Sequence, residues 1–324
     1  MGKDVVALGE LLIDFTENGV SAQGNPVMEA NPGGAPCNVL AMLTRLGHST
    51  AFIGKVGKDM FGTQLIGALK EVGIGTEGLV TDEKIHTTLA FVHTFPDGDR
   101  DFSFYRNPGA DMMLSADEVD EELIKNAKIF HFGSLSMTSE PVRSATVKAL
   151  DIAKNAGVTI SFDPNLREPL WETLDAARKE ISYGMSKCDI LKISDNEIIW
   201  FTGENDFDEG VKRLWEMYPD IKMILVSMGR DGSSCYRKNG KVTVMPFIQE
   251  NTIETTGAGD TFCAGILHYV LENGLRDYTE DDMREMLTFA NAGASIITTK
   301  KGALRVMPSK QEVEALIESR KYRL

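Results

Sequence analysis

The sequence predicts an α/β protein built around an open, mostly parallel β-sheet. Short apolar runs rich in β-branched residues recur along the chain, and such runs are typical of strands buried on both faces of a parallel sheet. Segments with helical periodicity lie between most of them, and this alternation favours a parallel sheet covered by helices. The predicted strands are Val5–Leu8, Ala51–Val56, Ile129–Phe132, Val158–Phe162, Ile190–Ile193 and Met223–Val226.

Two helices are predicted early in the chain by an apolar face and a glycine at the end. Pro36–Leu46 repeats apolar residues on one face and is followed by Gly47. Phe61–Val72 shows the same pattern and is followed by Gly73. Glycine just past the last periodic residue is a common helix stop. Capping-box patterns predict two further helix starts, at Ser115–Glu118 and Ser309–Glu312.

Two stretches interrupt the alternation and predict a second, smaller sheet. Residues 15–31 and 86–106 alternate apolar and polar side chains, lack a helical period and contain turn signals such as Pro96-Asp97-Gly98. This pattern indicates antiparallel strands inserted between α/β units. A further hairpin is predicted over Ser233–Phe247, because Asn239-Gly240 is a strong two-residue turn signal.

The composition is that of a soluble globular protein, with 42% hydrophobic and 25% charged residues among 324. This length allows one large domain or two ordinary ones. The formal net charge is −14, from 34 Lys and Arg against 48 Asp and Glu. A surface this acidic repels phosphate backbones and anionic lipids, so we expect neither nucleic acid nor membranes as partners. A small phosphorylated ligand is still compatible with a few local donors.

The cysteines are widely spaced and predict neither a zinc site nor a disulfide framework. No apolar run approaches the ~20 residues of a membrane span, and the N-terminal residues lack the apolar core of a secretory signal. We therefore expect a reduced, cytoplasmic protein. The cysteines are Cys37, Cys188, Cys235 and Cys263.

The most informative motif is Glu254-Thr-Thr-Gly-Ala-Gly-Asp260, which runs directly into an amphipathic helix. Gly257 and Gly259 let the backbone approach a ligand and turn its N–H groups toward it. Together with the dipole of the following helix, these groups predict an anion site. The Asp260 carboxylate could take a proton from a hydroxyl while the amides hold a phosphate, which suits phosphoryl transfer. The alternative, from this motif alone, is a Gly-rich loop with Asp260 as a helix N-cap.

Competing motifs are absent from the sequence. There is no G-x-x-x-x-G-K-[ST] loop, and the first strand ends at Gly9-Glu10 without a G-x-G-x-x-G turn, which argues against a nucleotide-dependent oxidoreductase. H-E-x-x-H and G-x-S-x-G are also missing. The histidines show no ligand spacing, and a structural role is expected for each: His48, His86, His93, His131 and His268.

Two blocks far apart in the chain carry a resemblance to a known family. One is Gly33-Gly-Ala-Pro-Cys-Asn-Val39 with Gly54–Gly62 downstream, and the other is Glu254–Asp260. In these blocks, and over essentially its whole length, the chain resembles the ribokinase-like (PfkB) carbohydrate kinases and, within them, the bacterial fructokinases. The resemblance implies a Rossmann-like, mostly parallel sheet flanked by helices. It also implies one kinase domain over residues 1–324, with a lid over the sugar formed by about 15–31 and 86–106.

The resemblance also implies roles for single residues. Asp260 would be the catalytic base, with the amides of Gly257, Ala258, Gly259 and Asp260 as the anion hole. A carboxylate at the end of the first strand can accept bonds from vicinal hydroxyls, which suits Asp14; a loop cap is the alternative. Ligands of open α/β sheets bind at strand ends such as Phe162–Arg167, where Arg167 could pair with the phosphate or form a surface salt bridge. The implied substrate contacts are Asp14, Gly33, Gly34, Asn38, Arg106, Asp163 and Arg167.

The nucleotide and ion sites follow from the same resemblance. Glu197 would order Mg²⁺ through water, and Ser194 stands where the family has Asn. A monovalent cation, K⁺, would be lined by Glu254, Thr256 and carbonyls near Gly302, although relatives usually carry Asp in place of Glu254. The implied ATP contacts are Ser194, Ser227, Gly229, Gly232 and Asn291, the last with a packing role as its alternative.

The function expected from these observations is ATP-dependent phosphorylation of a sugar, with D-fructose giving fructose 6-phosphate. A kinase for 2-keto-3-deoxygluconate or another ketose is the nearest alternative. A non-catalytic sugar-binding protein on the same fold is the second, and the intact Gly-Ala-Gly-Asp argues against it. A lid with open strand edges favours a homodimer formed through the lid.

Overall fold

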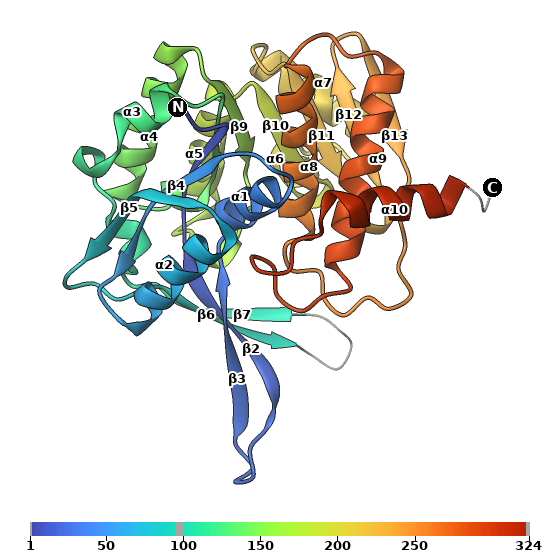
Figure 1. The fold of residues 1–324 in the computed structure, drawn as a ribbon. Helices are drawn as coiled ribbons and strands as arrows, with labels where there is room; N and C mark the ends of the chain where they lie inside the picture. Colours follow the sequence, from blue (N-terminus) through green and yellow to red (C-terminus); the bar gives the residue numbers. More distant parts are fainter. Residues whose placement is uncertain (1, 95–99, 322–324) are drawn as a thin grey trace.

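The computed structural model describes residues 2–94 and 100–321. It consists of a large α/β body and a small sheet from which the β2–β3 hairpin extends away (Figure 1). The predicted turn at 96–98 lies outside the described residues. No helix in the described ranges combines the length and the apolar character needed to cross a membrane.

The main sheet has nine strands among the described residues, in the order β13-β12-β11-β10-β9-β8-β1-β4-β5. The strands from β11 to β5 pair in parallel, whereas β12 and β13 form an antiparallel hairpin at one edge. This confirms the predicted sheet class, the six predicted strands and the Asn239-Gly240 turn. The strands are β1 (Val5–Leu8), β4 (Thr50–Gly57), β5 (Gly75–Asp82), β8 (Ile129–Gly133), β9 (Thr159–Asp163), β10 (Ile190–Ser194), β11 (Met223–Ser227), β12 (Ser233–Arg237) and β13 (Gly240–Val244).

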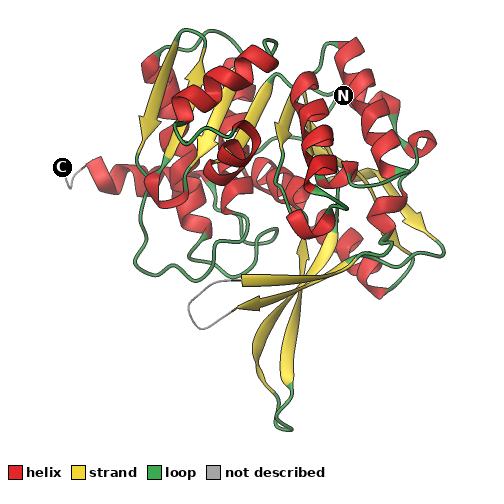
Figure 2. Cartoon of the chain, turned by 180° about the vertical axis from the view of Figure 1, so that it is seen from behind, coloured by secondary structure: helices red, strands yellow, loops and turns green. Residues whose placement is uncertain are grey.

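Helices cover both faces of this sheet (Figure 2). Successive side chains of a strand point to opposite faces, so β1 contributes to two apolar cores. Val5 and Ala7 join the core shared with α1, α8 and α9, and Val6 and Leu8 join the core shared with α4, α5 and α6. The α-helices are α1 (Ala35–Arg45), α2 (Met60–Val72), α3 (Glu121–Lys125), α4 (Val142–Ala156), α5 (Leu174–Lys187), α6 (Asp195–Thr202), α7 (Phe207–Met217), α8 (Ala258–Asn273), α9 (Glu280–Ile297) and α10 (Lys310–Lys321).

The second sheet has the strand order β3-β2-β6-β7; it confirms the predicted smaller sheet and is called the lid below, after the role expected for it. Its strands are β2 (Leu12–Val20), β3 (Pro26–Gly33), β6 (Leu89–Thr94) and β7 (Arg100–Tyr105). Both hairpins are antiparallel as predicted, but the central pair, β2 and β6, is parallel. The pattern of single strands cannot reveal this, because it does not say which strands of two separate hairpins meet.

Two local predictions need correction. The capping box at Ser115–Glu118 is present, but it opens a short 3₁₀ turn (Ala116–Glu118) instead of an α-helix. Strand β5 was not predicted, because it lies at the sheet edge and alternates partly buried polar and apolar residues. The capping box at Ser309 does precede α10.

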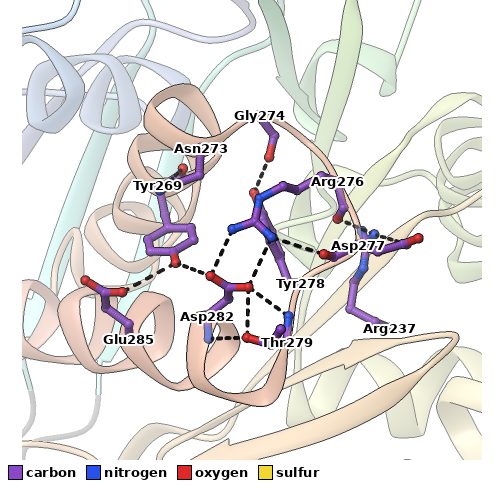
Figure 3. A network of polar contacts seen from close by, with 10 residues as sticks. All are labelled: Arg237, Tyr269, Asn273, Gly274, Arg276, Asp277, Tyr278, Thr279, Asp282 and Glu285. Atoms are coloured by element: carbon purple, nitrogen blue, oxygen red, sulfur yellow. Dashed lines mark hydrogen bonds and ion pairs between the residues drawn. The ribbon is translucent and has the colours of Figure 1, made fainter.

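The connection between α8 and α9 is fixed by a polar network (Figure 3). The Tyr278 hydroxyl donates to the Gly274 carbonyl at 2.6 Å. Thr279 caps α9, and the Asp282 carboxylate accepts from the Thr279 amide at 2.8 Å and from the Arg276 guanidinium at 2.9 Å. These bonds hold the C-terminal end of α8, the helix that begins at the Gly-rich motif.

Candidate active site

A pocket of about 380 Å³ lies where the lid, the N-termini of α1 and α8 and the carboxyl ends of central strands meet. Open α/β sheets bind ligands at such strand ends. Eight of the residues predicted for the site line it: Asp14, Gly34, Asn38, Arg167, Thr256, Gly257, Gly259 and Asp260.

Gly257–Asp260, here called the anion turn, starts α8. Gly257 has φ 76°, and a Cβ at this position would lie 2.8 Å from the Cβ of Ala303, so only glycine fits. The Ala258 amide donates to the Thr255 carbonyl at 3.2 Å. The first N–H groups of a helix have no acceptor within the helix, and Gly259 and Asp260 contribute two of them at the positive end of the helix dipole.

Asp260 is held by Asn38 from the first turns of α1. The Asn38 Nδ2 donates to the Asp260 Oδ2 at 2.8 Å, although the two residues are 222 positions apart. Asn38 is 5% exposed, and its Oδ1 has no hydrogen-bond partner among the described residues. Burial raises the pKa of Asp260, while the Asn38 bond and the charges of Lys192 and Arg167 oppose the rise.

Asp14 lies on β2 and faces the same pocket. Burial raises the pKa of Asp14 to about 7; the Arg167 charge opposes this, and the carboxylates of Asp260 and Glu254 add to it. A Cβ on Gly33 would lie 2.1 Å from the Asp14 Oδ2, so the glycine makes room for the carboxylate. Gly34 has φ 125°, and a Cβ there would meet the Glu10 carbonyl at 2.4 Å.

Glu10 is a pocket residue that the sequence analysis did not select. It is 3% exposed, and its Oε1 accepts from the Ala35 amide at the start of α1 at 2.9 Å. Burial raises the pKa of Glu10 to about 7. A carboxylate directly after an apolar strand was the available signal.

Arg106, predicted as a sugar contact, does not line the pocket. Its guanidinium is buried and donates to Asp111 at 2.7 Å, to the Leu135 carbonyl at 3.0 Å and to Thr138 at 3.1 Å. These partners tie the end of the lid to the body.

Asp163 ends β9 and forms an ion pair with Lys192 of β10, with Nζ and Oδ2 2.9 Å apart. Burial raises the pKa of Asp163 to about 6 against the opposing Lys192 charge. Burial alone would lower the pKa of Lys192, but the carboxylates of Asp163 and Glu197 raise it above its ordinary value. Lys192 lines the pocket and was not predicted from the sequence. The sequence did contain a feature that could have identified it, a lysine inside an otherwise apolar predicted strand.

Ser194 and Glu197 form the capping box of α6. The Glu197 carboxylate accepts from the Ser194 amide at 2.8 Å and from the Leu166 amide at 2.7 Å. Glu197 thereby ties α6 to the loop that carries Arg167, which is exposed at the mouth of the pocket.

Among the predicted ATP contacts, Ser227 is the last residue of β11, and Gly229 and Gly232 follow that strand. Gly229 and Gly232 have φ 52° and 91° in the turn before β12. Asn291 is 7% exposed; it accepts from the Ser233 hydroxyl at 2.9 Å and donates to the Val244 carbonyl at 3.2 Å. In this structure Asn291 therefore connects α9 to the β12–β13 hairpin.

The loops predicted to hold a monovalent cation lie together. The Glu254 Oε1 accepts from the Gly302 amide at 2.7 Å, and Gly302 has φ 84°. Thr256 lies between Glu254 and the anion turn and lines the pocket.

Solved structures share this fold over nearly the whole chain. The fructokinase from Xylella fastidiosa with bound ATP superposes with a TM-score of 0.89, at 29% identity, covering 98% of this chain and 99% of that one. A double-mutant fructokinase from Vibrio cholerae O395, in a form with fructose, ADP and potassium ion bound, gives a TM-score of 0.85 at 26% identity, covering 98% and 99%. The fold and pocket thus define a ribokinase-like kinase.

The sequence comparisons agree with this class. The model of the pfkB family of carbohydrate kinases matches residues 2–310, and the chain belongs to that family. Among curated proteins, the probable fructokinase-4 of Arabidopsis thaliana is 43% identical over 97% of this chain and 96% of its own length.

Proposed function

We propose that the protein is an ATP-dependent fructokinase that converts D-fructose to fructose 6-phosphate, with Asp260 as general base. The observation that carries the proposal is the Asn38–Asp260 contact at the anion turn, in a pocket lined by both the body and the lid. The similarity to fructokinases over nearly the full chain supports fructose as the substrate. We treat lid and body as one kinase domain, because the pocket needs both.

The chain's own residues suit the sugar. The unpartnered Asn38 Oδ1 can accept a bond from a sugar hydroxyl, and the Asp14 carboxylate can accept from vicinal hydroxyls. Since the Asn38 amide occupies one oxygen of Asp260, the other oxygen is available for the proton of the reacting hydroxyl.

The proposed reaction is an in-line phosphoryl transfer. The fructose 6-hydroxyl oxygen forms a bond to the γ-phosphorus while the bond from that phosphorus to the β,γ-bridging oxygen breaks. ADP leaves with the electron pair, and the hydroxyl proton passes to Asp260. Amides of the anion turn hold the transferred phosphate, and Arg167 adds positive charge from the pocket mouth. The lid excludes water that would otherwise accept the phosphate.

Magnesium fits the carboxylates near the phosphate end of the pocket. Mg²⁺ is usually held by one or two carboxylates, water and substrate phosphates. Glu197 is such a group and would hold Mg²⁺ through water, and its charge raises the pKa of Lys192 at the pocket. Magnesium would neutralise charge on the phosphates of bound ATP.

We propose K⁺ for the site at Glu254, Thr256 and the Gly302 region, because the loop that contains Glu254 is already hydrogen-bonded to the loop that contains Gly302.

The pocket's charges favour fructose over 2-keto-3-deoxygluconate. The acid sugar needs a positive partner, whereas Asp14 and Glu10 line the pocket and Arg106 is already paired with Asp111. A substrate carboxylate near Asp14 would be repelled in a cleft with little water. Steady-state kinetics with both sugars tests this: we expect a much higher kcat/KM for fructose, and a preference for the acid would reassign the substrate within the same chemistry.

The general-base role is tested by Asp260→Asn in a coupled ADP-release assay across a panel of sugars. The amide can still accept from Asn38, so the shape persists while the base is lost. We expect kcat to fall by ~10²–10⁴-fold, the usual contribution of a general base. Asp281→Asn is the matched control, because Asp281 is an exposed carboxylate in the first turn of α9. An Asp260→Asn variant that keeps more than about a tenth of kcat contradicts the assignment. A wild type that binds fructose without releasing ADP would instead be the sugar-binding alternative.

We also propose that two copies pair through the lid. The outer edge of β3 pairs with no strand in the described ranges, and Val20, Val27 and Tyr105 on the lid are 67%, 40% and 67% exposed. Open edges and apolar patches favour association. Light scattering should give a dimer mass for the wild type and a monomer mass for Val27→Lys; a monomeric wild type refutes the proposal.

We propose a cytoplasmic location, because all four cysteines are buried and free.

A further inference from the structure

Lys192 is a buried cation in the middle of the main sheet. It lies between Leu191 and Ile193 on β10 and is 6% exposed. Burying an ammonium opposes folding, and replacing a buried ion pair by apolar side chains is often neutral or stabilising. The ion pair with Asp163 therefore does not by itself account for a lysine at this position.

The side chain of Lys192 reaches the anion turn. A Cβ on Gly259 would lie 3.3 Å from the Lys192 Nζ and 4.0 Å from its Cε. Lys192 and Asp260 line the same pocket, and the Lys192 charge acts directly on Asp260. The ammonium is thus beside the backbone that would hold the transferred phosphate.

The ammonium also has donor capacity left for a ligand. It carries three N–H groups. Across residues 2–94 and 100–321, its acceptors are the two oxygens of one carboxylate, Asp163, at 2.9 and 3.2 Å. These contacts fix the position of Nζ against β9 while leaving the side toward the pocket without an acceptor.

We propose that Lys192 is a catalytic residue that donates a hydrogen bond to the transferring phosphoryl group at the anion turn, and that Asp163 holds its ammonium in place. The inference rests on the proposed kinase function. Negative charge on the phosphoryl oxygens must be stabilised during transfer, and a fixed cation in a site with little water does so most effectively. Arg167 is exposed at the mouth, so Lys192 supplies the positive charge from the floor of the pocket.

The test uses Lys192→Met, which keeps the length of the side chain and removes the charge, and the double variant Lys192→Met/Asp163→Asn, which leaves no unpaired buried charge. Both should lose kcat by about 10²–10³-fold, as when one donor to a developing charge is removed. The KM for fructose and the affinity for ATP should change little. Because a catalytic donor acts mainly in the transition state, Lys192→Met should also lose tight binding of ADP with aluminium fluoride and fructose.

Lys55→Met is the matched control. Lys55 is likewise buried on a strand, 8% exposed, and pairs with Glu118 at 2.8 Å, but it does not line the pocket. It should lower thermal stability and leave kcat unchanged. If the double variant recovers kcat to within tenfold of the wild type, Lys192 only neutralises Asp163 and the proposal is wrong. The pH profile of kcat gives a second test. If Lys192→Met shifts only the acidic limb of that profile and leaves the kcat plateau unchanged, Lys192 acts through the pKa of Asp260 and the proposal is wrong. A wild type without kinase turnover would refute the proposed function instead.

Discussion

Substituting Gly33 by alanine should weaken fructose recognition without unfolding the protein. The new Cβ would lie 2.1 Å from the Asp14 Oδ2, whereas ordinary contact begins at 3.4 Å. The carboxylate must therefore move by about 1.3 Å, the difference between these two distances. The backbone can tolerate alanine, because Gly33 has no positive φ and the obstacle is the end of a side chain.

The size of the effect follows from the bond that is lost. A hydrogen bond to a charged group contributes about 1.5–3 kcal/mol. Since about 1.4 kcal/mol corresponds to a factor of ten, kcat/KM for fructose should fall by roughly 10–150-fold. The KM for ATP and the thermal midpoint should change little, because the displaced carboxylate lines the side of the pocket that we assign to the sugar.

The assay is ADP release at varied fructose and saturating ATP. Gly67→Ala serves as the matched control, because Gly67 is exposed on α2 and an added Cβ meets nothing within 4 Å. An unchanged kcat/KM for fructose in Gly33→Ala, or a loss matched by Gly67→Ala, would refute the role of Asp14 in holding the sugar.

Three further predictions concern the anion turn, the cation and pH. Gly259→Val should weaken ATP binding, because the valine side chain would enter the space next to Lys192. ATP affinity is measured by calorimetry and thermal stability is measured in parallel. A variant that is less stable but binds ATP normally would show that the turn has only a structural role. Activity should be higher in potassium than in sodium or tetramethylammonium salts at matched ionic strength. Equal rates in the three salts would show that a monovalent cation does not contribute to activity. Because burial raises the pKa of Asp14 to about 7 and raises that of Asp260, both carboxylates gain protons as the pH falls. Hence kcat/KM for fructose should decline below about pH 7; a flat profile down to pH 5 would contradict these shifts.

The sequence was a reliable guide to the body of the fold because its strands are buried on both faces. The predicted strands in β1 and β11 are continuous apolar runs, and those in β8 and β10 are apolar apart from one buried residue each, His131 and Lys192. Such runs can be recognised without tertiary information. β5 was missed because an edge strand is only half-buried and its residues are mixed. The parallel pairing of β2 and β6 could not be predicted, since it joins strands from two separate hairpins.

Partners within the site were harder to predict than the residues themselves. The Gly-rich blocks contain Asn38 and the anion turn, which meet at the pocket. No local pattern indicates that Arg106 faces Asp111 or that Glu197 accepts from Leu166. Lys192 was overlooked because a single polar residue does not disturb an apolar strand pattern. A charged residue within a run that is otherwise buried on both faces is a signal that could have been used.

The position of Asp260 depends on the way two helices are joined at both ends. α1 and α8 run in the same direction, since Asn38 meets Asp260 near their starts and His48 meets His268 further along, with ring nitrogens 2.7 Å apart. The body of α8 packs in the same apolar core as α1, and the Tyr278 and Asp282 network holds its far end. A rigid helix pair fixed in this way sets the position of the carboxylate relative to the Asn38 amide, whereas the sugar-side carboxylate comes from the lid strand β2. Lid movement would therefore displace Asp14 while leaving Asp260 and the anion turn in place, which is the division of roles that the proposed closure over the sugar requires.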